Sequence, residues 1–250
     1  MNNFEKTNHL DKKETKRELV EFVKNLSEKM KRFELFNNLE NKKLSPEDYS
    51  KFFSHKYSAV GYFTDFLKRG SDISGNLKLP HLQETFQKNF EDESGIINGK
   101  YDKEWEHETW RQKMLQLLSV KKIEENNQKY SEMIESLSKE KDVFFMSGYL
   151  TTIELFVAIE MKNLWKAMKR DLPKEWTEYN EKNIPNNPLE YIKNHADHDG
   201  DHYDEILKAV LTDMKNSFEK ERCKDGMNFG YKTREVLYNH LNQVVFNSSK

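Results

Sequence analysis

The segment from Val143 to Leu172 constrains the fold of this chain most, because it is long, contains no proline and is the most apolar stretch of the sequence. Bulky apolar side chains such as Phe145, Ile153 and Phe156 recur along it at helical spacing. A helix that is apolar over most of its circumference is buried in the protein. We therefore predict a central core helix over these residues.

Helical spacing of apolar residues recurs in most of the remaining chain. Ser45 with Pro46 and Asp48 supplies an N-cap, a first helical position and an acid at the third, which together mark a helix start. Glycines and polar stretches predict loops at residues 71–79, around 95–99 and at 223–230. The predicted helices besides the central one cover residues 13–39, 46–70, 80–93, 104–118, 127–139, 188–219 and 231–246.

The composition favours an all-α protein. Among 250 residues there are only 5 Pro and 9 Gly, and 34% charged with 36% hydrophobic residues suits amphipathic helices with solvated outer faces. No repeat, low-complexity tract or linker divides the sequence. We expect residues 1–250 to form a single domain, a helical bundle of seven to nine helices with its core at about residues 13–246.

Charge and cysteine content exclude several classes of protein. The net charge of −2 and the lack of a basic stripe with interleaved aromatics disfavour nucleic acid and anionic membranes as partners. The single cysteine, Cys223, excludes an intramolecular disulfide. The start of the chain lacks a signal pattern, and by inspection no apolar run nears the roughly 18 residues of a membrane span. We expect a soluble, cytoplasmic protein.

The stretch from Asn187 to His202 is the strongest candidate for chemistry. Asn187, Pro188 and Glu190 form a helix-start signal. On the helix that follows, three polar side chains lie on one face, within roughly 60° of one another. They are His195, Asp199 and His202. Imidazole and carboxylate are ligand types that Fe, Zn and Mn accept, so this face is half of a candidate metal site. Taken alone, such a motif is more often a solvated His/Asp surface of a helix.

A carboxylate also interrupts the central helix. Glu160 falls in an apolar stripe with Ile153, Val157 and Leu164. Burying an ionised carboxylate alone is very unfavourable, so Glu160 is expected to pair with a cation or a metal, to be protonated, or to turn toward solvent. Glu154 has a weaker claim to the same argument and is interpreted as structural or exposed.

Three elements now follow one another in the sequence: the segment NFEDESG at 89–95 with a later His107, the acid Glu160, and the H-x3-D-x2-H motif at 195–202. In this order they resemble the haem-oxygenase-like diiron oxidases and oxygenases, iron-containing redox enzymes that share a fold with TenA, PqqC and CADD. The resemblance covers roughly residues 30–215 and is most specific in the last motif. It implies a haem-oxygenase-like helical bundle.

Carried over position by position, the resemblance implies a set of ligands for two Fe(II) ions: Glu93, His107, Glu160, His195, Asp199 and His202. Mixed oxygen and nitrogen ligation with open positions suits non-haem iron, although Mn occupancy stays open. Thirteen residues separate Glu93 from His107, more than is usual in the family, so Glu104 is a rival for the first carboxylate. Asp65 lies near a position where some members have an additional ligand.

The function implied is an Fe(II)- and O2-dependent oxidoreductase that oxidises a small organic acid or amine by carbon–carbon cleavage or N-oxygenation. The resemblance also implies a homodimer. We expect the substrate to contact aromatic residues of the second helix, with a cation as carboxylate anchor; the candidates are Tyr57, Tyr62 and Phe63, with Lys166 or Arg170.

Two other functions remain open. One is a non-enzymatic helical protein that binds metal or a partner. The other is a TenA- or PqqC-like enzyme without diiron; TenA-like catalysis relies on a cysteine in the helical core, whereas Cys223 is expected in a loop.

Overall fold

The computed structural model of the protein describes residues 11–57, 62–124, 127–178 and 186–247, without the side chains of 198–201. Within these residues the fold is all-α, with eleven α-helices, more than the seven to nine expected, one short 3-10 helix and one two-stranded hairpin. The bounds are α1 Lys12–Met30, α2 Glu34–Asn41, α3 Pro46–Lys56, α4 Phe63–Asn76, α5 Pro80–Glu93, β1 Ile96–Ile97, β2 Lys100–Tyr101, η2 Lys103–Trp105, α6 His107–Leu117, α7 Gln128–Ser138, α8 Val143–Asp171, α9 Lys174–Thr177, α10 Glu190–Asp213 and α11 Ser217–Phe246.

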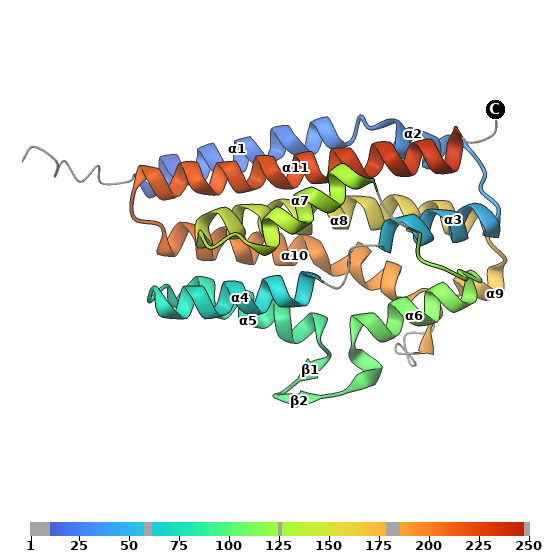
Figure 1. The fold of residues 1–250 in the computed structure, drawn as a ribbon, viewed down its shortest axis with the longest axis horizontal. Coiled ribbons are helices and arrows are strands. Elements are labelled where there is room, and N and C mark those ends of the chain that lie inside the picture. Colours follow the sequence, from blue (N-terminus) through green and yellow to red (C-terminus); the bar gives the residue numbers. More distant parts are fainter. Residues whose placement is uncertain (1–10, 58–61, 125–126, 179–185, 248–250) are drawn as a thin grey trace, which may run out of the picture.

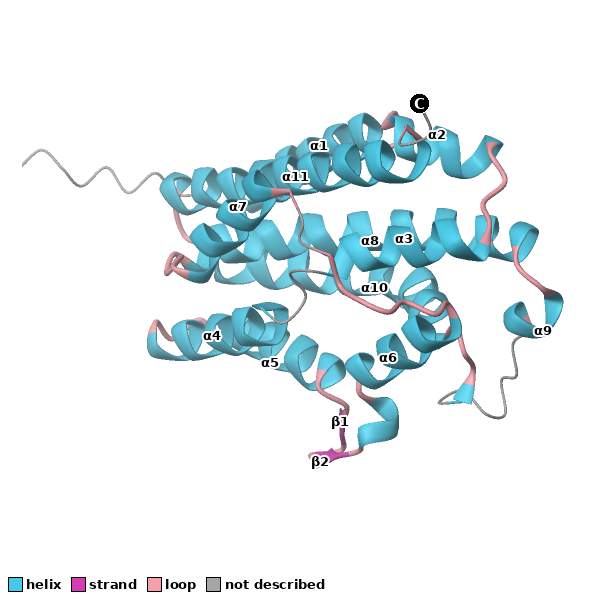
Figure 2. Ribbon diagram, turned by 45° about the vertical axis from the view of Figure 1, so that its right-hand side comes forward, coloured by secondary structure: helices cyan, strands magenta, loops and turns pink. Residues whose placement is uncertain are grey.

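Helix α8 lies in the middle of the bundle and makes its most extensive contacts with α10 and α11. Helices α1 and α11 run side by side along one edge, and α4 with α5 lies on the opposite side of α10 (Figure 1). The β1–β2 hairpin and α6 project from the end of the α4–α5 pair, an arrangement that the rotated view preserves (Figure 2). The end of α5 and the start of α6 therefore both lie against α10.

The predicted central helix is confirmed as α8. Asp142 caps it by accepting hydrogen bonds from the amides of Phe144 and Phe145, and its side chains fill the core. The expectation that no segment could span a membrane is wrong for this helix, because its length and composition would allow it. In the fold, 78% of its most apolar window is buried against other helices, as in the core helix of a soluble protein.

Glycines that suggest loops in the sequence instead permit close packing. The predicted loop at 223–230 is wrong, because α11 is helical through these residues. A Cβ at Gly226 would lie 1.9 Å from the carbonyl oxygen of Phe145, and a Cβ at Gly148 would lie 1.9 Å from that of Cys223. The two glycines therefore let the backbones of α8 and α11 touch, which no larger residue would allow.

Two predicted long helices are each divided in the structure. The first ends at Met30, and Phe33 adopts an extended conformation before α2, with its ring against Tyr231 and Tyr238. The second is divided into α3 and α4. Helix α4 also continues past Gly70 to Asn76, because Gly70 faces the ring of Phe86 across the α4–α5 contact rather than ending the helix.

Helix α10 begins at Glu190, slightly later than predicted, so Leu189 rather than Asn187 occupies the N-cap position, and Asn187 donates to the Glu190 carboxylate at 3.4 Å. It ends at Asp213, before the predicted residue 219, because Asn216 and Glu219 form a capping box that starts α11.

Candidate metal centre

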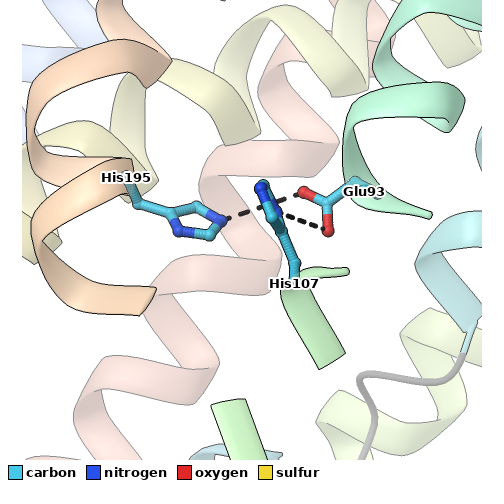
Figure 3. A group of neighbouring side chains, drawn as sticks. All are labelled: Glu93, His107 and His195. Carbon is cyan, nitrogen blue, oxygen red and sulfur yellow. Dashed lines mark ion pairs between the residues drawn. The ribbon is translucent and has the colours of Figure 1, made fainter. Parts of the chain in front are cut away.

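Three of the predicted ligands meet at one point. Glu93 is the last residue of α5, His107 is the first of α6 and His195 lies in α10. The Glu93 carboxylate approaches His107 Nδ1 at 3.1 Å through one oxygen and His195 Nε2 at 3.8 Å through the other. Figure 3 shows the carboxylate directed at both rings. The candidate ligand atoms all lie within 4.8 Å of one another.

A hairpin explains how thirteen intervening residues bring His107 back to Glu93. Gly95, with φ of +66°, ends α5 in the left-handed conformation, and its carbonyl accepts from the amide of Asp102 at 2.8 Å. A Cβ on Gly95 would lie only 2.7 Å from the Asp102 oxygen, so glycine is needed here. The strands β1 and β2 thus loop out while the chain returns to α6.

The rival first carboxylate, Glu104, does not join the cluster. Its side chain is exposed, and its backbone carbonyl accepts a hydrogen bond from Trp110 Nε1 at 2.7 Å. The indole of Trp110 in turn stacks on the His107 ring at 4.9 Å between centroids. Glu104 therefore helps to hold the start of α6 through its backbone, and Glu93 is the carboxylate beside His107.

The ring of His195 is oriented by its own helix. Its Nδ1 lies 2.7 Å from the carbonyl oxygen of Tyr191, and because a carbonyl can only accept, Nδ1 must carry the hydrogen. The lone pair of the neutral ring is then on Nε2, which faces Glu93. A hydrogen bond of this kind on the outer nitrogen is what orients metal-binding histidines in general.

The donor set fits a divalent transition metal. His107 Nδ1 is buried and makes no hydrogen bond within the described part of the chain, although Glu93 lies 3.1 Å away. A buried nitrogen without a hydrogen bond is costly unless something else occupies its lone pair. Ligand atoms bound to one ion at about 2.1 Å lie within roughly 4.2 Å of one another, so the cluster needs only a small contraction to hold a metal.

The carboxylate and the imidazoles of the cluster shift one another's pKa values. Burial alone would raise the pKa of Glu93, but the imidazoles of His107 and His195 hold that pKa below its ordinary range. Burial acts in the opposite direction on His107, where the carboxylate of Glu93 raises the pKa overall. Glu93 therefore stays ionised and available as an anionic ligand.

A second carboxylate–imidazole pair stands beside this cluster. His202, two turns after His195 in α10, places Nδ1 at 3.5 Å from Glu154 of α8, and its Nε2 lies 3.8 Å from Asp92. Burial lowers the pKa of His202, but the contact with Glu154 raises it overall. Glu154 is 6% exposed and lines the same cavity as Glu93 and His195, so of the two alternatives given for it, structural or exposed, the exposed one is wrong.

Glu160 is not brought to the cluster. It is fully buried, accepts hydrogen bonds from Lys56 and from the Tyr238 hydroxyl, and lies 3.8 Å from Arg234. Six residues after Glu154 on a helix, Glu160 points about 120° away from it, toward α3 and α11 rather than α10. Of the options open from the sequence, pairing with cations is the one observed.

Asp65 and Asp199 are the remaining predicted ligands. Asp65 is exposed in the first turn of α4 and does not approach the cluster. The side chain of Asp199 lies outside the described residues, so its predicted role as a ligand stays a prediction.

A cavity of about 480 Å³ opens beside the candidate metal-binding cluster. Tyr57, Tyr62 and Phe63 line it, as predicted, together with Glu93 and Glu154. Such a volume is typical of small-molecule sites. The aromatic residues of the second predicted helix thus lie beside the candidate ligands, and their contact with a substrate stays a prediction.

The predicted carboxylate anchors lie elsewhere. Lys166 is exposed and does not line the cavity. Arg170 donates to the carbonyls of Leu39, Glu40 and Lys42, where α2 ends. The cations that line the cavity are instead Lys56, Arg111 and Arg234. In the sequence, these three cations cannot be distinguished from surface charges. Only the density of aromatic residues around Lys56 indicates that this lysine could line a cavity.

Cys223 is buried in α11 rather than placed in a loop, which removes the sequence argument against a catalytic cysteine. Its thiol does not line the cavity, and burial raises its pKa to about 12. A thiol that is protonated at neutral pH and remote from the cavity is a poor nucleophile.

The chain matches no protein-family model and no curated protein. It is similar to the crystal structure of a CADD-like protein of unknown function from Nostoc punctiforme, with 14% sequence identity and a TM-score of 0.64 over 91% of this chain and 98% of that one. The protein therefore has a CADD-like helical fold. At this identity the likeness concerns the fold alone.

Proposed function

We propose that the protein is a non-haem diiron oxidase or oxygenase that uses dioxygen to oxidise a small organic molecule. The observation that carries the proposal is the Glu93 carboxylate held between the imidazoles of His107 and His195 at the wall of a cavity. Two imidazoles and a carboxylate around open positions form the ligand set of many oxygen-activating iron sites.

Glu154 and His202 support a second metal position. They come from α8 and α10, the helices that carry or face the first cluster, and their side chains lie 3.5 Å apart. We assign Glu154 the place in the ligand set that the family resemblance gave to Glu160. Asp199, one turn from His195 in α10, completes the proposed set.

The residues of the chain divide the work of the proposed reaction. The bound iron would supply the binding and reduction of dioxygen. Tyr191 keeps the His195 lone pair directed toward Glu93, where the two side chains would hold the iron, and the His107 ring is stacked on Trp110. Apolar side chains such as Phe63, Phe90 and Ile153 line the cavity and exclude water from the reacting substrate.

Iron content tests the proposal directly. The full-length chain loaded anaerobically with Fe(II) and desalted should retain about two iron atoms per chain, measured by a colorimetric chelator assay. His195→Ala should lose most of this iron. His240→Ala is the matched control, because His240 lies against His55 with 3.3 Å between ring nitrogens and does not line the cavity.

The position of the second carboxylate has its own comparison. Glu154→Gln should lower the iron content to about one atom per chain, since an amide is a much weaker ligand, whereas Glu160→Gln should leave it unchanged. Retention of full iron content by both His195→Ala and Glu154→Gln would sink the proposal. A loaded protein that consumes no oxygen with any small organic acid or amine would favour a metal-binding protein without oxidase activity.

A further inference from the structure

At one end of the cavity, a guanidinium nitrogen and a hydroxyl make no hydrogen bond to any described group. Arg234 of α11 is 8% exposed and lines the cavity, yet its Nε makes no hydrogen bond to any described group. The hydroxyl of Tyr57, which is 4% exposed and lines the same cavity, also makes no hydrogen bond of good geometry, although the Tyr191 side chain lies beside it. Buried donors are normally satisfied, so two such donors facing one cavity point to a missing acceptor.

The charges at this end sum to an excess of positive charge around Arg234. Within the described residues, the only carboxylate within 4.0 Å of Arg234 is Glu160, at 3.8 Å, and that carboxylate already accepts hydrogen bonds from Lys56 and Tyr238. A third cation, Arg111, is matched by its own partner, Glu108. A guanidinium that shares one carboxylate with a lysine is left without full compensation in a low-dielectric site.

The rest of the cavity wall is apolar. Ile153, Val157 and Met161 occur at every fourth residue of α8 and line the cavity as one stripe, with Phe63 and Phe90 also on the wall. The rings of Tyr57 and Tyr191 pack at 5.7 Å between centroids, and Tyr191 packs on His195 at 4.4 Å. Tyr57 thus leads from the cationic end of the cavity toward the proposed metal ligands.

We infer that this end of the cavity binds the carboxylate of an apolar monocarboxylic acid, with the Arg234 guanidinium as its anchor and the Tyr57 hydroxyl as a second donor. The guanidinium fork suits a carboxylate, and one uncompensated positive charge matches one negative charge. Amines and guanidines are disfavoured, because they would bring a cation against Arg234. That this acid is the substrate rests on the proposed oxidase function. Its binding at Arg234 does not.

Calorimetric binding to the full-length chain, with and without Fe(II) and without oxygen, tests the inference. The probes are straight-chain carboxylates from butanoate to decanoate and benzoate, each compared with its own primary amide. The best-binding acid should bind at least about tenfold more tightly than its amide, since hydrogen bonds to charged groups are the strong ones.

Substitutions then assign the anchor. Arg234→Met should lower the affinity for the acid by roughly 10- to 100-fold and leave the affinity for the amide nearly unchanged. Arg234→Lys keeps the charge without the fork, so it should retain part of the preference and serves if the methionine variant does not fold. Lys166→Met is the matched control, because this cation is exposed outside the cavity, and it should behave as wild type.

The outcomes separate this inference from the proposed function. It is overturned if no acid binds more tightly than its amide, or if both Arg234 variants keep the full preference. A preference that depends on Arg234 in a protein that binds no iron would support the anion site and reject the oxidase. Iron binding without any preference for acids would do the reverse.

Discussion

At the scale of single residues, side chains of the same type serve opposite purposes according to what packs around them. Arg234 lines a cavity, and its Nε makes no hydrogen bond to a described group. The guanidinium of Arg170 instead donates hydrogen bonds to backbone carbonyls at the end of α2 and to Asp171. Those carbonyls lie in the last turn of a helix, where no amide of the same helix can reach them. Arg170 is therefore structural, and Asp171 is the residue that orients it.

Asp171 should make the stability of the protein depend on pH. Its carboxylate is fully buried and accepts hydrogen bonds from the Leu44 amide, the Tyr49 hydroxyl and Arg170. Burial would raise the pKa of Asp171, but these hydrogen bonds hold it below the ordinary value. A lowered folded-state pKa stabilises the fold above the unfolded pKa of about 3.9, and the stabilisation is lost as pH falls through the folded value.

Asp171→Asn should consequently reduce the free energy of unfolding by about 2 kcal/mol at neutral pH, the range for hydrogen bonds to a charged group. The difference from wild type should shrink in acid, below about pH 4, because the native carboxylate is then being protonated. Urea unfolding at neutral and acidic pH measures both values. A difference that stays constant over this pH range would mean that the charge of Asp171 is not what stabilises the fold.

The sequence predicts the residues of the candidate metal-binding cluster only where each stands in a recognisable motif. Glu93, His107 and His195 were predicted because they stand in motifs at helix ends or on one helix face. The family resemblance implies Glu160 as the carboxylate from α8, whereas the structure places Glu154 beside His202. Helix α8 is buried on nearly every side, so an apolar stripe does not indicate which of its faces meets which helix. That choice depends on tertiary packing.

At the scale of elements, the structural role of a glycine is the feature that the sequence predicts least well. Gly70, Gly148 and Gly226 lie inside helices where two backbones or a backbone and a ring approach closely. Among the glycines that the structure describes, only Gly95 and Gly99 adopt positive φ, and both belong to the hairpin between α5 and α6. Propensity treats all five alike, because it contains no information about which helix will pack against which.

The hairpin allows a matched pair of substitutions. Gly95→Ala should destabilise the protein by about 2 kcal/mol or more, because the left-handed conformation costs roughly 1 kcal/mol and the new Cβ would meet backbone atoms of Asp102 and Glu106 at 2.7 Å. Gly99→Ala shares the positive φ but has nothing within 4 Å, so only the conformational cost of about 1 kcal/mol applies. Urea unfolding gives the two values.

The same pair tests whether the hairpin positions the metal ligands. Gly95→Ala should weaken Zn²⁺ binding, because Gly95 returns the chain from Glu93 to His107, whereas Gly99→Ala should leave it unchanged. Equal metal affinities for the two variants would show that the approach of Glu93 to His107 does not depend on the turn at Gly95.

At the scale of the whole molecule, the proposed metal ligands connect α6, which has few contacts with the bundle, to α5 and α10. Helix α8 is packed extensively against α10 and α11, but α6 reaches the bundle mainly through α10 and the end of α5. Its first residue, His107, is one of the three clustered ligands. A metal bound there would tie α5, α6 and α10 together, so metal binding and the stability of this end of the bundle should be coupled.

Metal addition should accordingly raise the melting temperature. A ligand that binds only the folded state at about 100 times its Kd adds about 2.7 kcal/mol, which corresponds to roughly 5–10 °C for a chain of this size. Zn²⁺ is a suitable redox-inert probe, with a chelator to reverse the shift. His195→Ala and His107→Ala should abolish the shift, and His240→Ala, remote from the cavity, should retain it. A shift that persists in both ligand variants would place the stabilising metal elsewhere and separate the coupling of α5, α6 and α10 from this cluster.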